Sequence, residues 1–155
     1  MASDGRDDID WALSVVRSHT LLTSGCSTDR LNKFQGDRQI QLPEAYLRFL
    51  AAVGGDAGEF LRGSDLTLDR LDALQTMARG LLAECGGPRL PMNAFSFCGH
   101  QDYQFLFFVI DGSSDPGVHR FVEGDSEFTP VAPRFSSWLV GAARDEFAPS
   151  PDGEL

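Results

Sequence analysis

The sequence predicts an α+β fold in a single domain, with a mainly antiparallel sheet from the C-terminal half packed against helices. Its 155 residues and 42% hydrophobic content are typical of one globular domain. Helical patterns come first and are followed by consecutive strands and a closing helix, which is the α+β order. Nine of the twelve phenylalanines lie between Phe95 and Phe147, where the apolar repeat changes from helical to alternating. We expect the domain to span residues 1–147, helices to cover one sheet face, and residues 148–155 to form a flexible tail.

A first helix is expected from Ile9 to Leu22, because two aspartates precede it and apolar residues then recur at helical spacing. The recurring apolar positions are Ile9, Ala12, Leu13 and Val16. The next segment, residues 23–39, is rich in Ser, Gly, Asn, Asp and Thr. This composition predicts a long loop, for which Leu31 and Phe34 would be the only anchors to the core.

Two more helices are expected before the sheet. The motif LPEAYLRFLAAVGG predicts one of them, because Pro43 fits a first helical turn and Gly54 supplies a left-handed stop. Its apolar face consists of Tyr46, Phe49, Leu50 and Val53. The other pattern starts near Thr67 and ends at Gly86, while Gly80 weakens its C-terminal half.

The C-terminal half predicts strands and a closing helix. Asn93–Cys98 alternates, whereas Tyr103–Ile110 is apolar on both faces and is therefore typical of a central strand covered on each side. Val118–Val122 and Ser126–Val131 flank an EGD turn and predict a hairpin, with a proline marking the end or edge of the second strand. The closing amphipathic helix is expected from Phe135, Trp138, Leu139 and Ala142.

The charge balance argues against a protein that binds nucleic acid directly. The chain has 13 basic and 23 acidic residues, a formal net charge of −10 and a pI near 4.5. Phosphate contacts are made mostly by Lys and Arg, but Lys33 is the only lysine and the arginines are scattered. The acidity favours solubility, or steering toward a basic partner.

The cysteines and apolar runs predict a cytoplasmic protein that does not enter a membrane. Three cysteines without CxxC spacing indicate neither a disulfide framework nor a zinc ribbon. The first ten residues contain four acids, which is unlike a signal peptide. The longest apolar run, Phe105–Ile110, is far shorter than the roughly 20 residues needed to cross a bilayer.

The sequence contains no motif for catalysis, cofactor binding or metal binding. GxSxG and HExxH are missing, and neither glycine pair belongs to GxGxxG or precedes GK[ST], so both pairs are interpreted as helix stops. Cys98 and His100 could contact a metal, but a structural site needs more ligands, and a buried thiol beside a loop imidazole fits better. Paired carboxylates lack an apolar wall and are expected in solvated turns and caps; they are Asp7–Asp8 and Glu123–Asp125. We therefore expect a protein that is not an enzyme and uses no cofactor.

One stretch of the sheet is strongly acidic. Between Gln101 and Thr129 there are six acids and one base, Arg120, which leaves five net negative charges. They belong to predicted strand ends and turns, so an acidic docking face and ordinary solvated turns are both open alternatives. The candidate partner-binding residues are Asp102, Tyr103, Gln104, Asp111, Asp115, His119, Glu123, Asp125 and Glu127.

Four motifs, in chain order, are LPEAYLRFLAAVGG, MNAFSFCGHQDYQFLFFVIDG, DPGVHRFVEGD and APRFSSWLVGA. Their order and spacing over residues 40–143 resemble the SUKH superfamily (Smi/Knr-like), bacterial immunity proteins related to a fungal regulator of cell-wall synthesis. The matching positions are LPxxYxxFL at Leu42, Pro43, Tyr46, Phe49 and Leu50, the pair Gly54 and Gly55, the strand Phe105 to Phe108, Asp115 and Pro116 with Val118, and FxxWL at Phe135, Trp138 and Leu139.

This resemblance implies an α+β protein that binds a cognate protein toxin and neutralises it by occlusion. Toxins of such polymorphic systems are often nucleases or deaminases. Separately from the resemblance, we hypothesise that the acidic face contributes to binding, with Tyr103 as an aromatic anchor. The resemblance implies no cofactor and transfers no catalytic residue. An alternative is a regulatory or scaffold module like the fungal relatives. A third hypothesis is a small enzyme, whose activity would be lost on mutation of His100 or His119.

Overall fold

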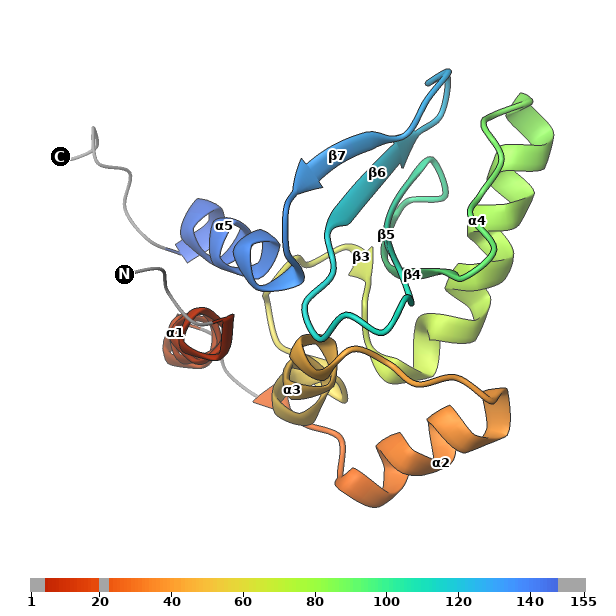
Figure 1. The fold of residues 1–155 in the computed structure, drawn as a ribbon. Coiled ribbons are helices and arrows are strands. Elements are labelled where there is room, and N and C mark those ends of the chain that lie inside the picture. Colours follow the sequence, from red (N-terminus) through yellow and green to blue (C-terminus); the bar gives the residue numbers. More distant parts are fainter. Residues whose placement is uncertain (1–4, 20–22, 148–155) are drawn as a thin grey trace, which may run out of the picture.

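A five-stranded antiparallel sheet lies at the centre of the structure, a computed structural model that describes residues 5–19 and 23–147 (Figure 1). The strand order is β3-β4-β5-β6-β7, so neighbours along the chain are neighbours in the sheet. The strands are β3 (Ser64–Asp65), β4 (Ala94–His100), β5 (Gln104–Val109), β6 (Val118–Val122) and β7 (Thr129–Ala132). A small second sheet pairs β1 (Thr23–Ser24) with β2 (Asp56–Ala57).

Five α-helices surround this sheet in the described part of the chain and confirm the predicted α+β class. They are α1 (Gly5–His19), α2 (Thr28–Arg38), α3 (Glu44–Val53), α4 (Leu71–Cys85) and α5 (Phe135–Phe147), and a 3-10 turn, η1 (Leu68–Arg70), precedes α4. The predicted end of the first helix at residues 20–22 and the predicted tail at residues 148–155 lie outside the described residues.

Helices cover both faces of the central sheet, so the expectation of one covered face is wrong (Figure 1). On one side α4 packs so closely on β4 that a side chain at Gly99 would come within 2.4 Å of Leu74. On the other side Phe97 of β4 contacts the aromatic rings of α3 and α5. We call these two sides the α4 face and the α5 face. Because β5 is apolar on both faces, it needs cover on both.

A β-bulge in β4 places two consecutive side chains, Phe97 and Cys98, on the α5 face. Ser96 pairs with Phe107, and Cys98 pairs with Leu106, so that Phe97 is the extra residue. Gln75 of α4 holds the bulge: its Oε1 accepts from Ser96 N at 2.9 Å and its Nε2 donates to Ser96 O at 2.6 Å. The bulge therefore fixes the end of the sheet on which the candidate site is built.

Aromatic side chains fill the core on the α5 face. Tyr46 of α3 is fully buried, and its ring centroid lies 5.2 Å from Phe108 and 5.5 Å from Phe135. Both pairs meet edge to face, which the quadrupole of an aromatic ring favours. The predicted apolar face of this helix is confirmed, since Tyr46, Phe49, Leu50 and Val53 are all buried.

The glycine that follows α3 has a different role from the one predicted. Gly54 has φ −69°, which is right-handed, and its N donates to Leu50 O at 2.9 Å. A Cβ at this position would lie 2.6 Å from that same carbonyl oxygen, so close packing requires the glycine. The left-handed stop is found instead at Gly86, with φ 64°, where α4 ends as predicted.

Residues 23–39 contain the helix α2, so the prediction of a long loop in this segment is wrong. Ser27 caps α2 by accepting a hydrogen bond from Arg30 N at 3.2 Å, and Gln39 ends the helix with φ 53°. Leu31 and Phe34, the two predicted anchors, are buried and lie one helical turn apart. The spacing of Leu31 and Phe34 is helical, but the polar composition of the segment favoured a loop in the prediction.

Candidate functional site

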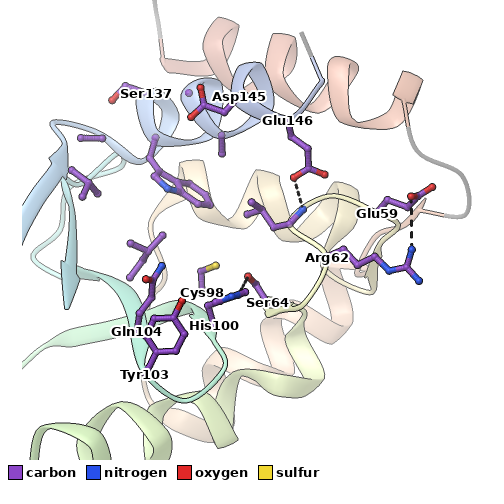
Figure 2. Close-up of a pocket in the computed structure, with 17 residues that line it drawn as sticks. Glu59, Arg62, Ser64, Cys98, His100, Tyr103, Gln104, Ser137, Asp145 and Glu146 are labelled. Carbon is purple, nitrogen blue, oxygen red and sulfur yellow. Dashed lines mark hydrogen bonds and ion pairs between the residues drawn. The ribbon is translucent and has the colours of Figure 1, made fainter. Parts of the chain in front are cut away.

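A groove of about 850 Å³ lies on the α5 face (Figure 2). Its walls come from three segments that are far apart in sequence. They are the loop between β2 and β3 with the start of β3, the β4–β5 hairpin, and β7 with α5. The groove lies where α5 does not cover the sheet, so that Cys98 and Leu106 line its floor. Its volume lies within the range of about 300–1,000 Å³ typical of binding sites.

The centre of the groove is apolar. Leu106 of β5, Val131 of β7 and Trp138 of α5 line it. Val131 is 36% exposed and Tyr103, at the hairpin end, is 38% exposed. An exposed aliphatic side chain and an exposed aromatic side chain beside one hollow are typical of an interaction surface rather than of scattered surface residues.

Carboxylates lie on the rim at the α5 end of the groove. Asp145 and Glu146 come from the last turns of α5, and Glu59 comes from the loop between β2 and β3 (Figure 2). Arg62 also lies on this rim, and its Nη1 is 3.9 Å from Glu59 Oε1. Glu146 Oε1 accepts a hydrogen bond from Leu61 N at 2.9 Å, which ties the loop to α5 and closes this end.

Polar groups on the groove floor form a short chain at the end of β4. Ser64 Oγ lies 3.2 Å from His100 Nδ1, and the His100 ring meets Tyr103 edge to face at 5.7 Å (Figure 2). Burial raises the pKa of the Cys98 thiol to about 12, although a hydrogen bond with Ser64 opposes this shift. Cys98 is therefore a neutral thiol at neutral pH and supplies no thiolate.

The structure brings five of the nine candidate partner-binding residues to one end of the sheet. Glu123 N donates to Tyr103 O at 2.8 Å, so the β4–β5 turn and the β6–β7 turn lie side by side. We call this the hairpin-end surface; it consists of Asp102, Tyr103, Gln104, Glu123 and Asp125. Asp102 and Glu123 are exposed, whereas Asp125 closes its own turn by accepting from Val122 N at 3.1 Å.

The other four candidates are not part of this surface, although Glu127 belongs to the same β6–β7 connection. Asp111 and Asp115 follow β5, at the opposite end of the sheet. Asp115 holds the start of α5, because Ser136 N and Ser136 Oγ donate to its carboxylate at 2.8 Å and 2.6 Å. His119 stacks on Phe107 at 5.3 Å on the α4 face, and it lines a smaller pocket of about 370 Å³ together with Glu127.

The two histidines singled out in the sequence are on opposite faces of the sheet. His100 is paired with Gln104, whose side chain lines the groove on the α5 face, and His119 is paired with Phe107 on the α4 face. They cannot act on one substrate together. Among residues 5–19 and 23–147 there is no group of three or more His, Cys, Asp or Glu side chains that could hold a metal ion.

The groove itself was missed by the sequence analysis. Trp138 was predicted on the closing helix, but Glu59, Asp145 and Glu146 were not candidates, and no local pattern links them. They meet only because β3 pairs with β4 and α5 crosses the same face. Within the described residues, no helix combines the length and the apolar character needed to cross a membrane.

Comparison with known proteins agrees with this architecture. The family model of the SMI1 / KNR4 family (SUKH-1) matches residues 25–141, which is about three quarters of the chain. No curated protein matches the chain. The matched segment begins before α2 and ends within α5, so it includes the whole central sheet and the first half of α5, while Asp145 and Glu146 of the groove rim follow it. The chain therefore belongs to the SMI1 / KNR4 family (SUKH-1).

Proposed function

We propose that this protein is an intracellular immunity protein that binds a cognate polymorphic toxin and neutralises it by occlusion. Membership of the SMI1 / KNR4 family supports a protein-binding role in general. The observation that carries the proposal to this chain is the meeting of two acidic turns at the hairpin-end surface, joined by the hydrogen bond from Glu123 N to Tyr103 O. The net charge of −10 adds long-range attraction to a basic partner.

The physical reason for an acidic partner lies in the toxin's own chemistry. An enzyme that attacks nucleic acid needs a basic cleft to hold phosphates. A rigid protein that presents Asp102 and Glu123 on neighbouring turns is attracted to such a cleft and blocks it. Tyr103, partly exposed between these two carboxylates, supplies apolar area for the contact. Inhibition of this kind needs binding alone, with no turnover by the inhibitor.

The first experiment identifies the partner. The full chain is used to capture binding proteins from the source organism, and a captured candidate is then expressed with and without this chain. We expect the candidate to be toxic alone and growth to be restored by co-expression. Capture of a host protein that has no toxicity would contradict the immunity role and favour the regulatory or scaffold alternative.

The second experiment tests the hairpin-end surface. The double variant Asp102→Lys and Glu123→Lys is compared with the double variant Glu84→Lys and Asp29→Lys, which changes the net charge equally at exposed sites on α4 and α2. We expect only the first variant to lose tenfold or more in affinity for the toxin and to associate more slowly at low salt. Equal losses of affinity in both variants would mean that the net charge of the protein, and not the hairpin-end surface, determines toxin binding.

A further inference from the structure

We propose that the groove on the α5 face binds an extended segment of the partner protein that has apolar side chains at its centre and lysine or arginine at its ends. This inference rests on the proposed function and names the chemistry of the partner's docking segment. The groove has an apolar centre and an acidic rim at its α5 end, and the exposed Asp102 adjoins Tyr103 at its other end.

The apolar centre is open to a ligand. In the described residues, four large hydrophobic side chains are exposed, and Tyr103 and Val131 of these four line the groove. Trp138 forms its wall and packs edge to face on the buried Phe97 at 4.9 Å, which holds the indole rigid. Covering this surface with apolar side chains of a partner removes it from water, which favours binding.

The charges around the centre select a basic segment. The ionised side chains that line the groove are three carboxylates and one guanidinium, a balance of two negative charges. The guanidinium of Arg62 is placed beside Glu59, and Glu146 accepts a hydrogen bond from Leu61 N, while the exposed Asp145 lies on the same rim (Figure 2). At the opposite end, Asp102 lies next to Tyr103 on the exposed turn. A basic side chain at each end of a bound segment therefore meets a carboxylate.

The shape of the groove favours an extended segment over a compact small molecule. It runs from the end of α5 to the β4–β5 turn, and its volume of about 850 Å³ is near the upper limit for small-molecule sites. The sheet forms the floor, and alternate side chains of an extended chain can point toward that floor while the others point to solvent.

The test uses Trp138 as the reporter. The chain has two tryptophans, so Trp11→Phe leaves the groove tryptophan as the only one. This variant is titrated with the amidated peptide KKLFLKK and with its acidic counterpart EELFLEE. We expect a saturable change in Trp138 emission with KKLFLKK and at least tenfold weaker binding of EELFLEE. Equal binding of both peptides, or no saturable change with either one up to millimolar concentration, would overturn the groove assignment.

Variants on the same background locate the contact. We expect Asp145→Lys and Val131→Asp each to weaken KKLFLKK binding at least fivefold, because both side chains line the groove. Glu84→Lys on α4 makes the same charge change as Asp145→Lys and is expected to leave binding unchanged. An equal loss with Glu84→Lys would show that net charge alone attracts the peptide and would overturn the inference.

The groove and the proposed function fail in different ways. If the toxin binds the Asp145→Lys and Val131→Asp variants as tightly as it binds the unchanged chain, the groove inference is wrong and the immunity role still holds. If no toxin is captured and no growth is restored, the immunity role is wrong, whatever the peptides do. Loss of toxin binding in both groove variants, with the Glu84→Lys variant unaffected, supports both proposals.

Discussion

At the residue scale, Tyr46 is the clearest case in which a core position was predicted and its chemistry was not. The helical spacing placed it on the buried face of α3, but its hydroxyl is buried and has no hydrogen-bond partner in the described structure. Burial raises the pKa of this hydroxyl well above its usual value, so it stays neutral. A pattern of apolar and polar residues does not show whether a tyrosine hydroxyl reaches a hydrogen-bond partner, because that depends on the side chains packed around it.

We expect Tyr46→Phe to increase stability by about 1 kcal/mol. The change removes a buried polar group that lacks a partner and keeps the ring that packs on Phe108 and Phe135. Urea unfolding followed by circular dichroism measures the difference. Phe97→Leu, which removes a ring from the same cluster, serves as the control and is expected to destabilise. A loss of stability in Tyr46→Phe would show that the hydroxyl has a partner after all.

The three cysteines differ in exposure, and this predicts their reactivity. Cys85 is exposed, whereas Cys26 and Cys98 are buried and burial raises the pKa of both thiols. Because the thiolate is the reactive form, a raised pKa lowers reactivity at a given pH. With iodoacetamide at pH 8 we expect one fast alkylation in the folded protein and three in urea, counted by mass spectrometry. Cys85→Ser should abolish the fast one; rapid alkylation that persists in this variant would mean that a buried thiol is accessible.

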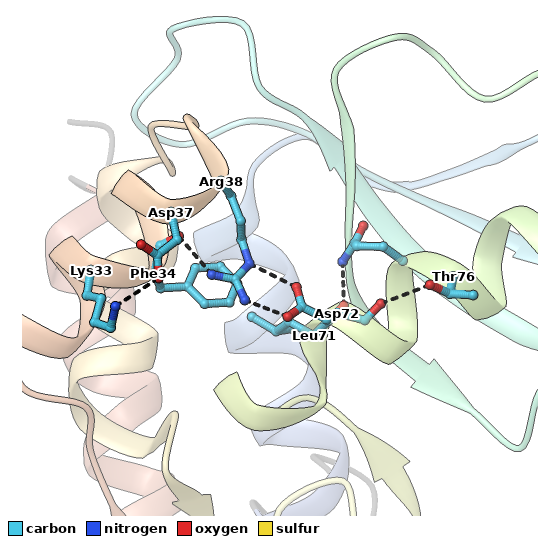
Figure 3. Close-up of polar contacts among 8 residues, drawn as sticks. Lys33, Phe34, Asp37, Arg38, Leu71, Asp72 and Thr76 are labelled. Atoms are coloured by element: carbon cyan, nitrogen blue, oxygen red, sulfur yellow. Dashed lines mark hydrogen bonds and ion pairs between the residues drawn. The ribbon is translucent and has the colours of Figure 1, made fainter.

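At the scale of elements, α2 shows why a helix with a polar surface escapes a sequence-based analysis. It presents only Leu31 and Phe34 to the core, and it also forms an ion pair with α4, 34 residues away (Figure 3). Arg38 Nε donates to Asp72 Oδ1 at 2.8 Å, and its guanidinium lies 3.7 Å from the centre of the Phe34 ring. Such a contact has no local signature. By contrast, α3 and α5 carry wide apolar faces, which are visible in sequence.

The Arg38–Asp72 pair predicts a dependence of stability on pH. The hydrogen bond from Arg38 lowers the pKa of Asp72 below its usual 3.8. The pair thus stabilises the fold above the pKa of the unfolded state, and this stabilisation is lost as pH falls through the lower folded pKa. Because Asp72 is 68% exposed, we expect Asp72→Asn to cost at most about 1 kcal/mol at pH 7 and less at pH 2. Urea unfolding at both values measures this; an equal cost at both would indicate lost packing instead.

The β4–β5 turn carries a conformational cost at the hairpin-end surface. Gln101 and Asp102 have φ 50° and 63°, so both central residues are left-handed, a geometry that favours Asn and Gly. We expect Gln101→Asn with Asp102→Gly to raise stability by about 1 kcal/mol and to weaken toxin binding, since Asp102 is lost. Gln101→Asn alone should stabilise and leave binding intact. Denaturant unfolding and affinity measured on the same samples check both; a gain in binding would contradict the role of Asp102.

At the scale of the whole molecule, the topology decides which predicted residues become neighbours. The sequence correctly placed the six acids in turns and strand ends, but it could not show that the turns after β4 and β6 share one end of the sheet and the turn after β5 lies at the other. The apolar pattern of β5, by contrast, did indicate that helices cover both faces of the sheet. A β5 that is apolar on both faces requires two covering layers, and this signal outweighs the order of elements along the chain.

The same scale raises the question of whether α1, which precedes the family match at residue 25, is part of the domain. Its buried side chains Ile9, Ala12, Leu13 and Val16 pack against α3 and α5, the two helices that cover the α5 face. Arg134 Nη2 lies 3.3 Å from Asp8 Oδ2 and adds a polar link to the start of α5. We therefore expect α1 to fold together with the sheet as one unit.

Ile9→Ala tests this expectation, because Ile9 is fully buried. Removal of a buried isoleucine costs about 2–5 kcal/mol, a large part of the roughly 5–15 kcal/mol that stabilises a domain. We expect one cooperative urea transition in the unchanged chain and in the variant, with a lower midpoint in the variant and the same shift whether circular dichroism or Trp138 emission in the Trp11→Phe background is followed. If α1 were an appendage, the emission of Trp138 in the groove wall would keep its original midpoint, since the sheet and α5 would unfold independently of α1. A shared shift would instead mean that α1 supports the helix that forms one wall of the groove.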